Sequence, residues 1–216
     1  EGENPEDSPY VQLTTGIIAA FPSSGGIFSI DPDASSASYF WAADWILGKR
    51  AETHSSRIRV ANWVENSLQI DARFPKLIQT FPERLSRRDH LGDSIMTAVV
   101  LAPFAGAPKT FVDLGRLRVQ ECERVRALHT ELRKCGASIV EEGDTLRVVP
   151  GPLHGAEIET YGDHRMAMCF AVLGLVVPGI RIRNPECVRK TFPNFFEKLS
   201  QPPPGGLGVR VRNEPS

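Results

Sequence analysis

Charged and apolar residues meet in the stretch Glu159-Thr160-Tyr161-Gly162-Asp163-His164-Arg165-Met166-Ala167-Met168. It places an acid, an imidazole and a guanidinium in three consecutive positions, directly before an apolar run. The pattern predicts a helix that begins at Asp163 or His164. Arg165 would lie in its first turn, beside unpaired backbone N–H groups that also attract anions. We expect the apolar side chains of this helix to be buried: Met166, Ala167, Phe170, Ala171 and Leu173.

Two interpretations of this helix start remain open from the motif alone. Asp163 is either only an N-cap with Arg165 solvated at the surface, or part of a site for a phosphate or carboxylate. Two other segments also place cations next to an expected element boundary: Arg116–Arg124 and Arg189–Phe196. Three separated cationic segments favour an anion site over cations that are merely solvated at the surface.

The composition limits the kind of ligand. The chain has 216 residues, 41% of them hydrophobic and 24% charged, enough for a buried core in one large domain or two small ones. It has 25 Lys and Arg against 26 Asp and Glu, so the net charge is -1. No global basic field would attract nucleic acid or a membrane. We therefore expect a small anionic ligand in a local cluster, and neither nucleic acid nor a membrane as a partner.

The cysteines and the apolar runs indicate the compartment. Four cysteines lie far apart with no Cys-x-x-Cys pair: Cys122, Cys135, Cys169 and Cys187. Three of them fall in apolar helical patterns, where cysteine behaves as a small hydrophobe, as in a reducing cytosol. No apolar run reaches the roughly 18 residues that a membrane span requires. The sequence predicts a soluble, cytoplasmic chain.

Helix and strand patterns alternate along the chain. We expect helices over residues 33–45, 71–81, 95–104 and 119–135, and further helices from 163 and from 193. We expect strands over residues 57–61, 109–114, 137–140, 145–149 and 180–183. The four residues Glu141–Asp144 contain a glycine and predict a hairpin turn. This order favours α/β repeats over one doubly wound sheet.

The chain resembles the C-terminal half of the 5-enolpyruvylshikimate-3-phosphate (EPSP) synthase family, the 3-phosphoshikimate 1-carboxyvinyltransferases that glyphosate targets. Five segments carry the resemblance, in the family's order: Asp33–Phe40, Gly92–Thr97, Arg118–Gly136, Tyr161–Phe170 and Cys187–Phe196. The most specific pair is Tyr161–Met168 with Lys190–Pro193, because two unrelated anion motifs rarely coincide in the right order by chance. The resemblance implies one lobe of the family's inside-out α/β barrel, in which repeated units pack helices inside and sheets outside.

This resemblance, together with composition, divides the chain into three parts. We expect residues 1–30 to be a remnant of the N-terminal lobe or hinge. Residues 31–200 would form the C-terminal enolpyruvyl transferase lobe. The Pro- and Gly-rich residues 201–216 would form a flexible tail.

The activity that the resemblance implies is transfer of the enolpyruvyl group of phosphoenolpyruvate to the 5-hydroxyl of shikimate 3-phosphate, in aromatic amino acid biosynthesis. The methylene carbon is protonated, the hydroxyl oxygen adds to C2, and the tetrahedral adduct eliminates inorganic phosphate. No metal or organic cofactor is required. The expected partners are the two anionic substrates and an N-terminal lobe supplied by another chain.

The resemblance also assigns site residues. Asp93 would be the general base that contacts the acceptor hydroxyls, and Glu121 would exchange protons with the methylene carbon. Their structural alternatives are a helix N-cap and a solvated acid. The cations that would bind phosphoenolpyruvate are Arg124, Arg165 and Lys190. The residues that would bind shikimate 3-phosphate are Tyr10, Asp93, Arg116 and Gln120.

Several departures from the family stand beside these assignments. Gln120 occupies a position where a lysine is usual, which removes one ligand contact, and Arg116 occupies one where an asparagine is usual. Cys122 and Glu123 replace the common threonine and aspartate. The family's N-terminal half supplies a phosphate loop with no counterpart here, so we expect little turnover from this chain alone.

Two rival functions remain. One is enolpyruvyl transfer to a UDP-amino sugar, which shares the architecture. The other is a noncatalytic anion-binding lobe or one half of a split enzyme.

Overall fold

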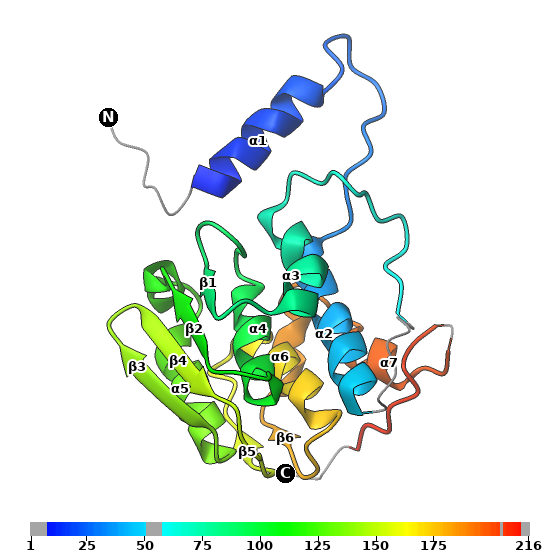
Figure 1. The fold of residues 1–216 in the computed structure, drawn as a ribbon. Helices are drawn as coiled ribbons and strands as arrows, with labels where there is room; N and C mark the ends of the chain where they lie inside the picture. The colour runs from blue at the N-terminus through cyan, green and yellow to red at the C-terminus, as the bar shows by residue number, and fades with distance from the viewer. Residues whose placement is uncertain (1–7, 51–57, 204, 213–216) are drawn as a thin grey trace.

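The computed structural model describes residues 8–50, 58–203 and 205–212 (Figure 1). Its α-helices in these ranges are α1 (Ser8–Ala20), α2 (Ala34–Arg50), α3 (Phe74–Thr80), α4 (Ile95–Leu101), α5 (Arg124–Lys134), α6 (His164–Gly174) and α7 (Phe195–Ser200). Its strands are β1 (Arg84–Ser86), β2 (Lys109–Val112), β3 (Ser138–Glu142), β4 (Thr145–Val149), β5 (Glu157–Ile158) and β6 (Arg181–Ile182). Short 3-10 helices are η2 (Ile70–Arg73), η3 (Ala102–Phe104), η4 (Gly115–Val119) and η5 (Pro185–Lys190).

Two strand–helix–strand units organise the chain. β1 and β2 are parallel neighbours joined through α4, and β5 and β6 are parallel neighbours joined through α6. A crossover helix brings the chain back to the edge where the first strand began, so both strands of a unit end on the same side of their sheet. The loops that follow these strands are therefore brought together in pairs.

A hairpin completes the larger sheet, whose strand order is β1-β2-β4-β3. β3 and β4 pair in antiparallel register with Glu142 opposite Thr145, which leaves Gly143 and Asp144 as a two-residue loop. Gly143 has a φ of 53°, the left-handed conformation that tight hairpin turns need. The predicted hairpin is confirmed.

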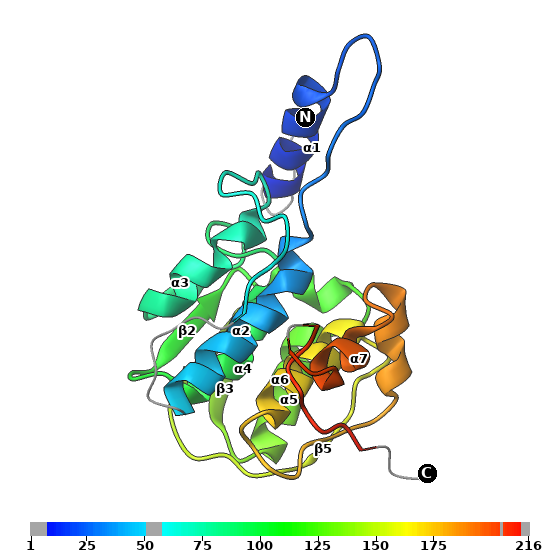
Figure 2. The ribbon, with the colours of Figure 1, turned by 90° about the vertical axis from the view of Figure 1, so that its right-hand side faces the viewer.

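The core lies around α4 and α6, between the four-stranded sheet and helices α2 and α7 (Figures 1 and 2). Every residue of α4 is buried, and so are most residues of α6. A helix that is apolar on all sides is stable only when it is enclosed, which explains their central place. β4 buries Leu146 and Val148 and exposes Arg147, so the sheet has one packed and one outer face. This arrangement of helices inside and sheet outside is the α/β repeat architecture that the resemblance implied.

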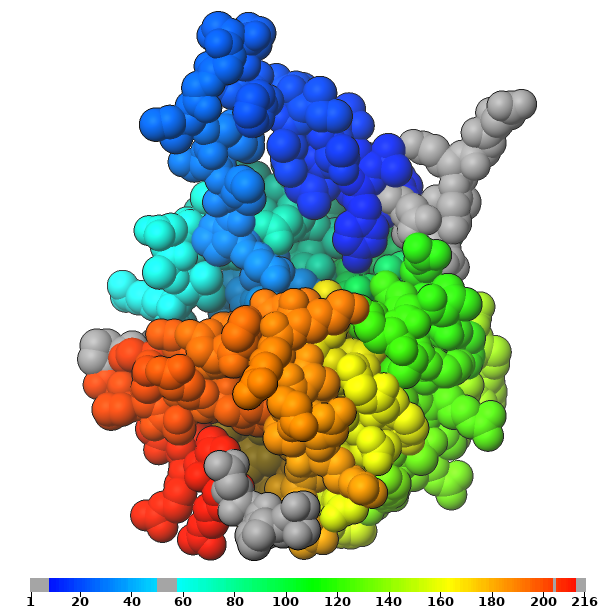
Figure 3. Space-filling model, turned by 180° about the vertical axis from the view of Figure 1, so that it is seen from behind, coloured from blue at the N-terminus to red at the C-terminus, as the bar shows by residue number. Residues whose placement is uncertain are grey.

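Helix α1 and residues 21–30 project from one end of the molecule (Figures 1 and 3). None of the helix's residues is buried. The Leu68 side chain packs against Gly16, where an added Cβ would lie 2.5 Å from Cδ1 of Leu68. Large apolar side chains are exposed on this projection: Val11, Ile18, Phe21, Ile27 and Ile30.

Two expectations about elements are wrong. The strand predicted over 57–61 is absent from residues 58–61, because alternation alone does not make a strand without a neighbouring strand; Arg57 lies outside the described residues. The helix predicted from Val119 begins at Arg124, with Glu123 as its N-cap. Val119 is 70% exposed and takes no part in the core. The remaining predicted helices and strands are found with shifted ends: α2 and β3 run further than predicted, whereas β2, β6 and α7 are shorter.

The described part of the predicted tail runs beside α7. The N–H groups of Leu207 and Val209 donate to the carbonyls of Lys198 and Leu199 at 3.3 and 2.9 Å. The three-part division of the chain stays a prediction. No helix in the described ranges combines the length and the apolar composition that crossing a lipid bilayer requires.

Candidate functional site

The carboxyl ends of the four parallel strands lead into the loops that carry the predicted site residues. The loop after β1 holds Asp93, and the segment after β2 holds Gln120 and Glu121. The loop after β5 leads to Arg165, and the turn after β6 ends at Lys190. Ligands of α/β folds bind at this edge because strand ends and helix starts converge there. Residues up to 97 positions apart are thus brought to one place.

Asp93 lies at the centre and is 8% exposed. Its Oδ1 accepts hydrogen bonds from Nε and Nη2 of Arg87 at 3.3 and 3.1 Å. Its Oδ2 lies 3.2 Å from Nε2 of Gln120, 3.4 Å from Nη1 of Arg124 and 3.5 Å from Nε of Arg165. Burial by itself raises the pKa of Asp93, but the guanidinium groups of Arg165, Arg87 and Arg124 outweigh it and hold that pKa below its usual range. Asp93 is therefore an anion with both oxygens occupied.

Arg124 lies between Asp93 and Glu121 and is 1% exposed. Its Nε donates to Oδ2 of Asp163 at 2.7 Å, and its Nη2 donates to Glu121. Its Nη1 contacts Asp93 and Gln120. A buried guanidinium is tolerated only when carboxylates surround it, and here they do.

Glu121 and Lys190 form the outer end of the cluster. Nζ of Lys190 lies 2.6 Å from Oε1 of Glu121, and the lysine side chain is 58% exposed. Partial burial opposes ionisation, but the Lys190 hydrogen bond and the Arg124 charge lower the pKa of Glu121 to about 2. Glu121 is thus ionised in the ligand-free chain.

The start of α6 is built as the sequence predicted, with Asp163 as N-cap. Oδ1 of Asp163 accepts from the backbone N–H of Arg165 at 2.7 Å, while the same carboxylate holds Arg124. Asp163 is therefore both a cap and part of the charged cluster, and the Arg165 side chain is only 17% exposed. The site for a phosphate or carboxylate stays a prediction. Of the side chains predicted to be buried on α6, Ala171 alone is only half-buried.

Tyr161 and Glu131 fix the loop before α6. Tyr161 has a φ of 55° and Gly162 one of 69°, so two successive residues turn left-handed. A tyrosine there is strained, and it is held because its hydroxyl donates to Oε1 of the fully buried Glu131 at 2.8 Å. Glu131 also accepts from the backbone N–H of Glu159 at 3.1 Å. The carboxylate on α5 thereby sets the path of the loop that delivers Arg165.

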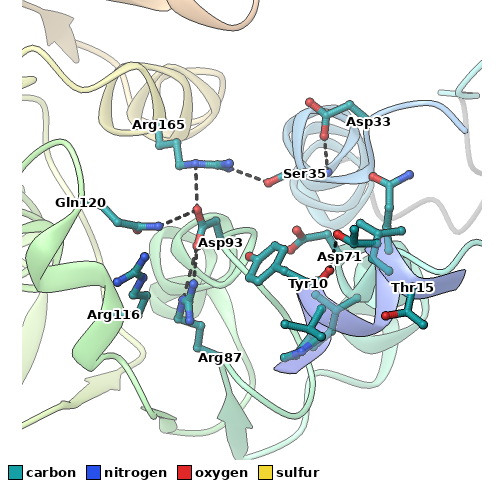
Figure 4. Close-up of a pocket in the computed structure, with 16 residues that line it drawn as sticks. Tyr10, Thr15, Asp33, Ser35, Asp71, Arg87, Asp93, Arg116, Gln120 and Arg165 are labelled. Carbon is teal, nitrogen blue, oxygen red and sulfur yellow. Dashed lines mark hydrogen bonds and ion pairs between the residues drawn. The ribbon is translucent and has the colours of Figure 1, made fainter. Parts of the chain in front are cut away.

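A cavity of about 700 Å³ opens beside Asp93, between α1 and the body of the molecule (Figure 4). Its polar and charged lining comes from several elements: Tyr10, Thr14, Thr15, Asp33, Ser35, Gln69, Asp71, Arg87, Asp93, Arg116, Gln120 and Arg165. All four residues expected to bind shikimate 3-phosphate are among them. Arg124, Glu121 and Lys190 lie outside this cavity and reach it through Asp93 and Gln120. The predicted residues therefore form a cavity group and an outer group joined by Arg124.

Tyr10 closes the α1 side of the cavity. A Cβ added at Gly92 would lie 2.7 Å from the Tyr10 hydroxyl and 3.0 Å from Oδ2 of Asp71, so both side chains pack closely against this glycine. The Tyr10 ring lies 6.0 Å from Cζ of Arg87. Burial raises the pKa of both Tyr10 and Asp71. Asp71, which accepts from the backbone N–H of Ser94 at 2.9 Å, is thus shifted toward its neutral form.

The sequence reasoning missed Arg87 and Asp71 as cavity residues. Arg87 stands next to the partly exposed Arg88, and nothing in the pattern distinguishes the two. Asp71 was read only as the start of a helix. The positions of Arg87 and Asp71 in the cavity are set by β1 and η2. These elements are too short to be predicted from hydrophobic periodicity.

Burial raises the pKa of all four cysteine thiols. Burial raises the pKa of Cys122 to about 12 and that of Cys135 to about 11, so neither thiol ionises near neutral pH. Among the described residues, no group of three His, Cys, Asp or Glu side chains has the geometry to hold a metal ion.

A family model described as EPSP synthase (3-phosphoshikimate 1-carboxyvinyltransferase) matches residues 14–199. The 3-phosphoshikimate 1-carboxyvinyltransferase of Nostoc punctiforme is 38% identical over 193 residues, which cover 81% of this chain and 44% of that protein. The protein of the same name from Rhizobium etli is 36% identical over 230 residues, covering 95% of this chain and 52% of that protein. The chain spans about half the length of the curated relatives it matches.

Solved structures share the fold at lower sequence identity. EPSP synthase from Acinetobacter baumannii superposes with a TM-score of 0.55 at 20% identity, covering 80% of this chain and 46% of that one. The enolpyruvyl transferase NikO from Streptomyces tendae superposes with a TM-score of 0.53 at 16% identity, covering 79% of this chain and 42% of that one.

Proposed function

Because this chain belongs to the EPSP synthase (3-phosphoshikimate 1-carboxyvinyltransferase) family, we propose that it forms one substrate-binding wall of an enolpyruvyl transferase. The reaction moves the enolpyruvyl group of phosphoenolpyruvate to the 5-hydroxyl of shikimate 3-phosphate and releases inorganic phosphate. The substrates are small anions, and the chemistry needs positive charge and proton transfer rather than a cofactor.

The observation that supports this function is a continuous chain of charge contacts. It runs from Arg165 through Asp93, Arg124 and Glu121 to Lys190, with every nitrogen–oxygen separation at or below 3.5 Å. Two carboxylates thus stand among three cations at the edge where four strands end. A wall of this kind suits a trianionic ligand beside a hydroxyl that must lose its proton.

Asp93 is our candidate for the general base. It is ionised and stands in the cavity, but both of its oxygens are occupied. A substrate hydroxyl must therefore displace a donor, and Gln120 is the neutral one. We infer that Gln120 yields first, because separating an amide from a carboxylate costs less than separating a guanidinium.

Glu121 is our candidate for the proton exchange with the methylene carbon. A proton donor must first carry a proton, and the low pKa of Glu121 depends on Lys190 and Arg124. When phosphoenolpyruvate binds these two cations, their hold on Glu121 weakens and its pKa rises. Substrate binding would thus prepare the acid that the reaction needs.

We further propose that the chain needs a second lobe for turnover. It spans about half of its relatives' length, and a single wall leaves the ligands in water, where charge contacts are weak. Phosphate release would be measured with both substrates, for the chain alone and for the chain mixed with the N-terminal half of a relative such as that of Nitrosomonas europaea.

The expected result is release only in the mixture, and its loss when Lys190→Met is used. Lys198→Met on α7 is the matched control, because it removes the same charge away from the site. Full activity of the chain alone would overturn the need for a second lobe. Absence of both release and ligand binding would overturn the enolpyruvyl transferase assignment.

A noncatalytic anion-binding lobe is the second candidate, and the half-length coverage of relatives is the observation that favours it. Calorimetry separates the two. A noncatalytic remnant binds neither substrate whether or not the N-terminal half is present, whereas half of a working enzyme gains affinity on mixing. A UDP-amino sugar as acceptor is the weaker rival, since the matching family model describes the shikimate enzyme.

A further inference from the structure

Arg87 is a buried cation at the floor of the cavity. It lies one residue after β1, and its side chain is only 2% exposed. Its backbone N–H donates to the carbonyl of Val112 at 3.0 Å, which extends the pairing of β1 with β2 and fixes where the side chain begins. Figure 4 shows its guanidinium pointing at Asp93, with Arg116 beside it.

The guanidinium is only partly used. Nε and Nη2 both donate to Oδ1 of Asp93, and among the described residues Nη1 has no hydrogen-bond partner. Arginine carries five N–H donors in a rigid fork. No nitrogen of Arg87 is among the buried side-chain atoms of the described residues that lack a partner, so its spare donors are not sealed in the core. In Arg87 the spare donors belong to a side chain that lines the cavity.

The charges of the cavity favour an anionic guest. Three guanidiniums line it, those of Arg87, Arg116 and Arg165, and three carboxyls face them. One of these carboxyls, Asp71, is shifted toward its neutral form by burial. The raised pKa of Asp71 weakens the negative side of this lining, which favours an entering anion beside the three guanidiniums.

Arg87 also stands opposite the position where this chain departs from its family. Gln120 replaces a lysine that contacts ligand in the family pattern, and it bonds Oδ2 of Asp93. Arg87 bonds the other oxygen of the same carboxylate. The two side chains thus flank Asp93, one having lost a positive charge and the other supplying one.

We propose that Arg87 is a ligand-binding residue that replaces the missing lysine and holds the phosphate of the acceptor substrate. Asp93 fixes the guanidinium through Nε and Nη2, and Nη1 donates to a phosphate oxygen. A dianionic phosphate suits this place because it accepts several charge-assisted bonds from the guanidiniums of the lining. This inference rests on the proposed function, because it takes shikimate 3-phosphate as the acceptor.

The test is calorimetric binding of shikimate 3-phosphate and of shikimate, which lacks the phosphate. Arg87→Met should weaken binding of shikimate 3-phosphate roughly 10- to 100-fold, the loss expected for one charge-assisted contact, and change binding of shikimate less than about twofold. Arg88→Met is the matched control and should alter neither, because the adjacent Arg88 pairs with Asp89 outside this cavity.

A rescue variant makes the test specific. Gln120→Lys in the Arg87→Met background should restore most of the affinity for shikimate 3-phosphate, since it returns the cation to the other side of Asp93. If Arg87→Met does not fold, Arg87→Lys keeps the charge on Asp93 but cannot contact both groups, and should still show the phosphate-selective loss.

The binding results test the role of Arg87 separately from the proposed enolpyruvyl transferase function. Equal losses for both ligands, or no loss, would contradict the role of Arg87 while leaving the proposed function intact. Failure of the unaltered chain to bind shikimate 3-phosphate, alone and with an N-terminal half, would contradict both.

Discussion

Asp163 combines at a single residue two roles that usually belong to different side chains. It caps α6 through the N–H of Arg165 and neutralises Arg124, and it is fully buried. Asp33 caps α2 in the same way, through the N–H groups of Ser35 and Ser36, but it is exposed and pairs with no buried cation in the part of the chain that the structure describes. Comparing Asp163 with Asp33 therefore separates two contributions to stability: that of an N-cap, and that of the carboxylate that neutralises a buried cation.

We expect Asp163→Ala to lower the free energy of unfolding by about 3–5 kcal/mol, because it leaves Arg124 buried beside fewer carboxylates. Asp33→Ala should cost only about 1 kcal/mol, the usual value of a cap. Urea unfolding followed by circular dichroism measures both. Equal losses for the two variants would show that Arg124 does not depend on Asp163.

Lys190 controls the ionisation of Glu121. We expect Lys190→Met to raise the Glu121 pKa from about 2 toward its ordinary value of 4.5, because the hydrogen bond and charge that lower it are lost. Carboxyl-carbon NMR titration measures this shift, and Lys198→Met should leave it unchanged.

The same pair gives a pH signature in stability. A carboxyl whose folded pKa is depressed stabilises the fold above its unfolded pKa and loses that effect as the pH falls through the folded value. The unaltered chain should therefore be more stable than Lys190→Met above about pH 4.5, and the difference should vanish near pH 2. A difference that persisted at pH 2 would point to packing instead of ionisation.

Residue identities made part of this site predictable. Asp163 and Arg165 were visible because a helix start has a recognisable pattern, and Lys190 because it stands beside a second boundary. Arg87 was not, since its burial follows from a three-residue strand that carries no periodic signal. The family resemblance supplied roles for Asp93 and Glu121 that spacing alone does not.

At the scale of elements, the longest predictions were right about existence and wrong about ends. The apolar periodicity of α5 extends back to Val119, yet the helix starts at Arg124 because Gln120 leaves the helical backbone region, with φ -95° and ψ -141°. This break turns Gln120 toward Asp93. The contact between Gln120 and Asp93 thus requires a non-helical backbone where the apolar periodicity predicts a helix. Periodicity alone cannot reveal such a break.

The β5–α6–β6 unit depends on a close backbone contact. A side chain at Gly155 would lie 2.4 Å from the carbonyl oxygen of Pro178. We expect Gly155→Ala to lower the free energy of unfolding by about 1–3 kcal/mol or more. The atoms nearest to the added carbon belong to the backbone of Pro178 and Gly179 and cannot rotate away. Gly106→Ala is the control, since nothing lies within 4 Å of its added carbon. Thermal unfolding of the two variants measures the difference, and a neutral Gly155→Ala would show that the loop can shift.

At the scale of the whole molecule, the body and the α1 projection differ in how they are held. The body has a continuous core around α4 and α6, whereas α1 buries none of its residues. Sequence patterning could anticipate the core, because buried helices are apolar on all sides. The predicted division sets residues 1–30 apart from the lobe, but it contains no predicted helix, whereas the structure forms α1 there with Val11 and Ile18 exposed.

This difference predicts an uneven pattern of amide hydrogen exchange. The amides of α1 should exchange orders of magnitude faster than those of α4 and α6, because few buried contacts oppose local opening. Residues 9–11 and 13–15 line the cavity beside Arg87 and Arg165, so adding shikimate 3-phosphate should slow exchange in the first half of α1. Helix α7 lies away from the cavity and should not respond. Exchange in α1 as slow as in α4 would show that the projection is held by contacts stronger than those of Tyr10 and Gly16, and a ligand-independent α1 would remove Tyr10 from the acceptor site.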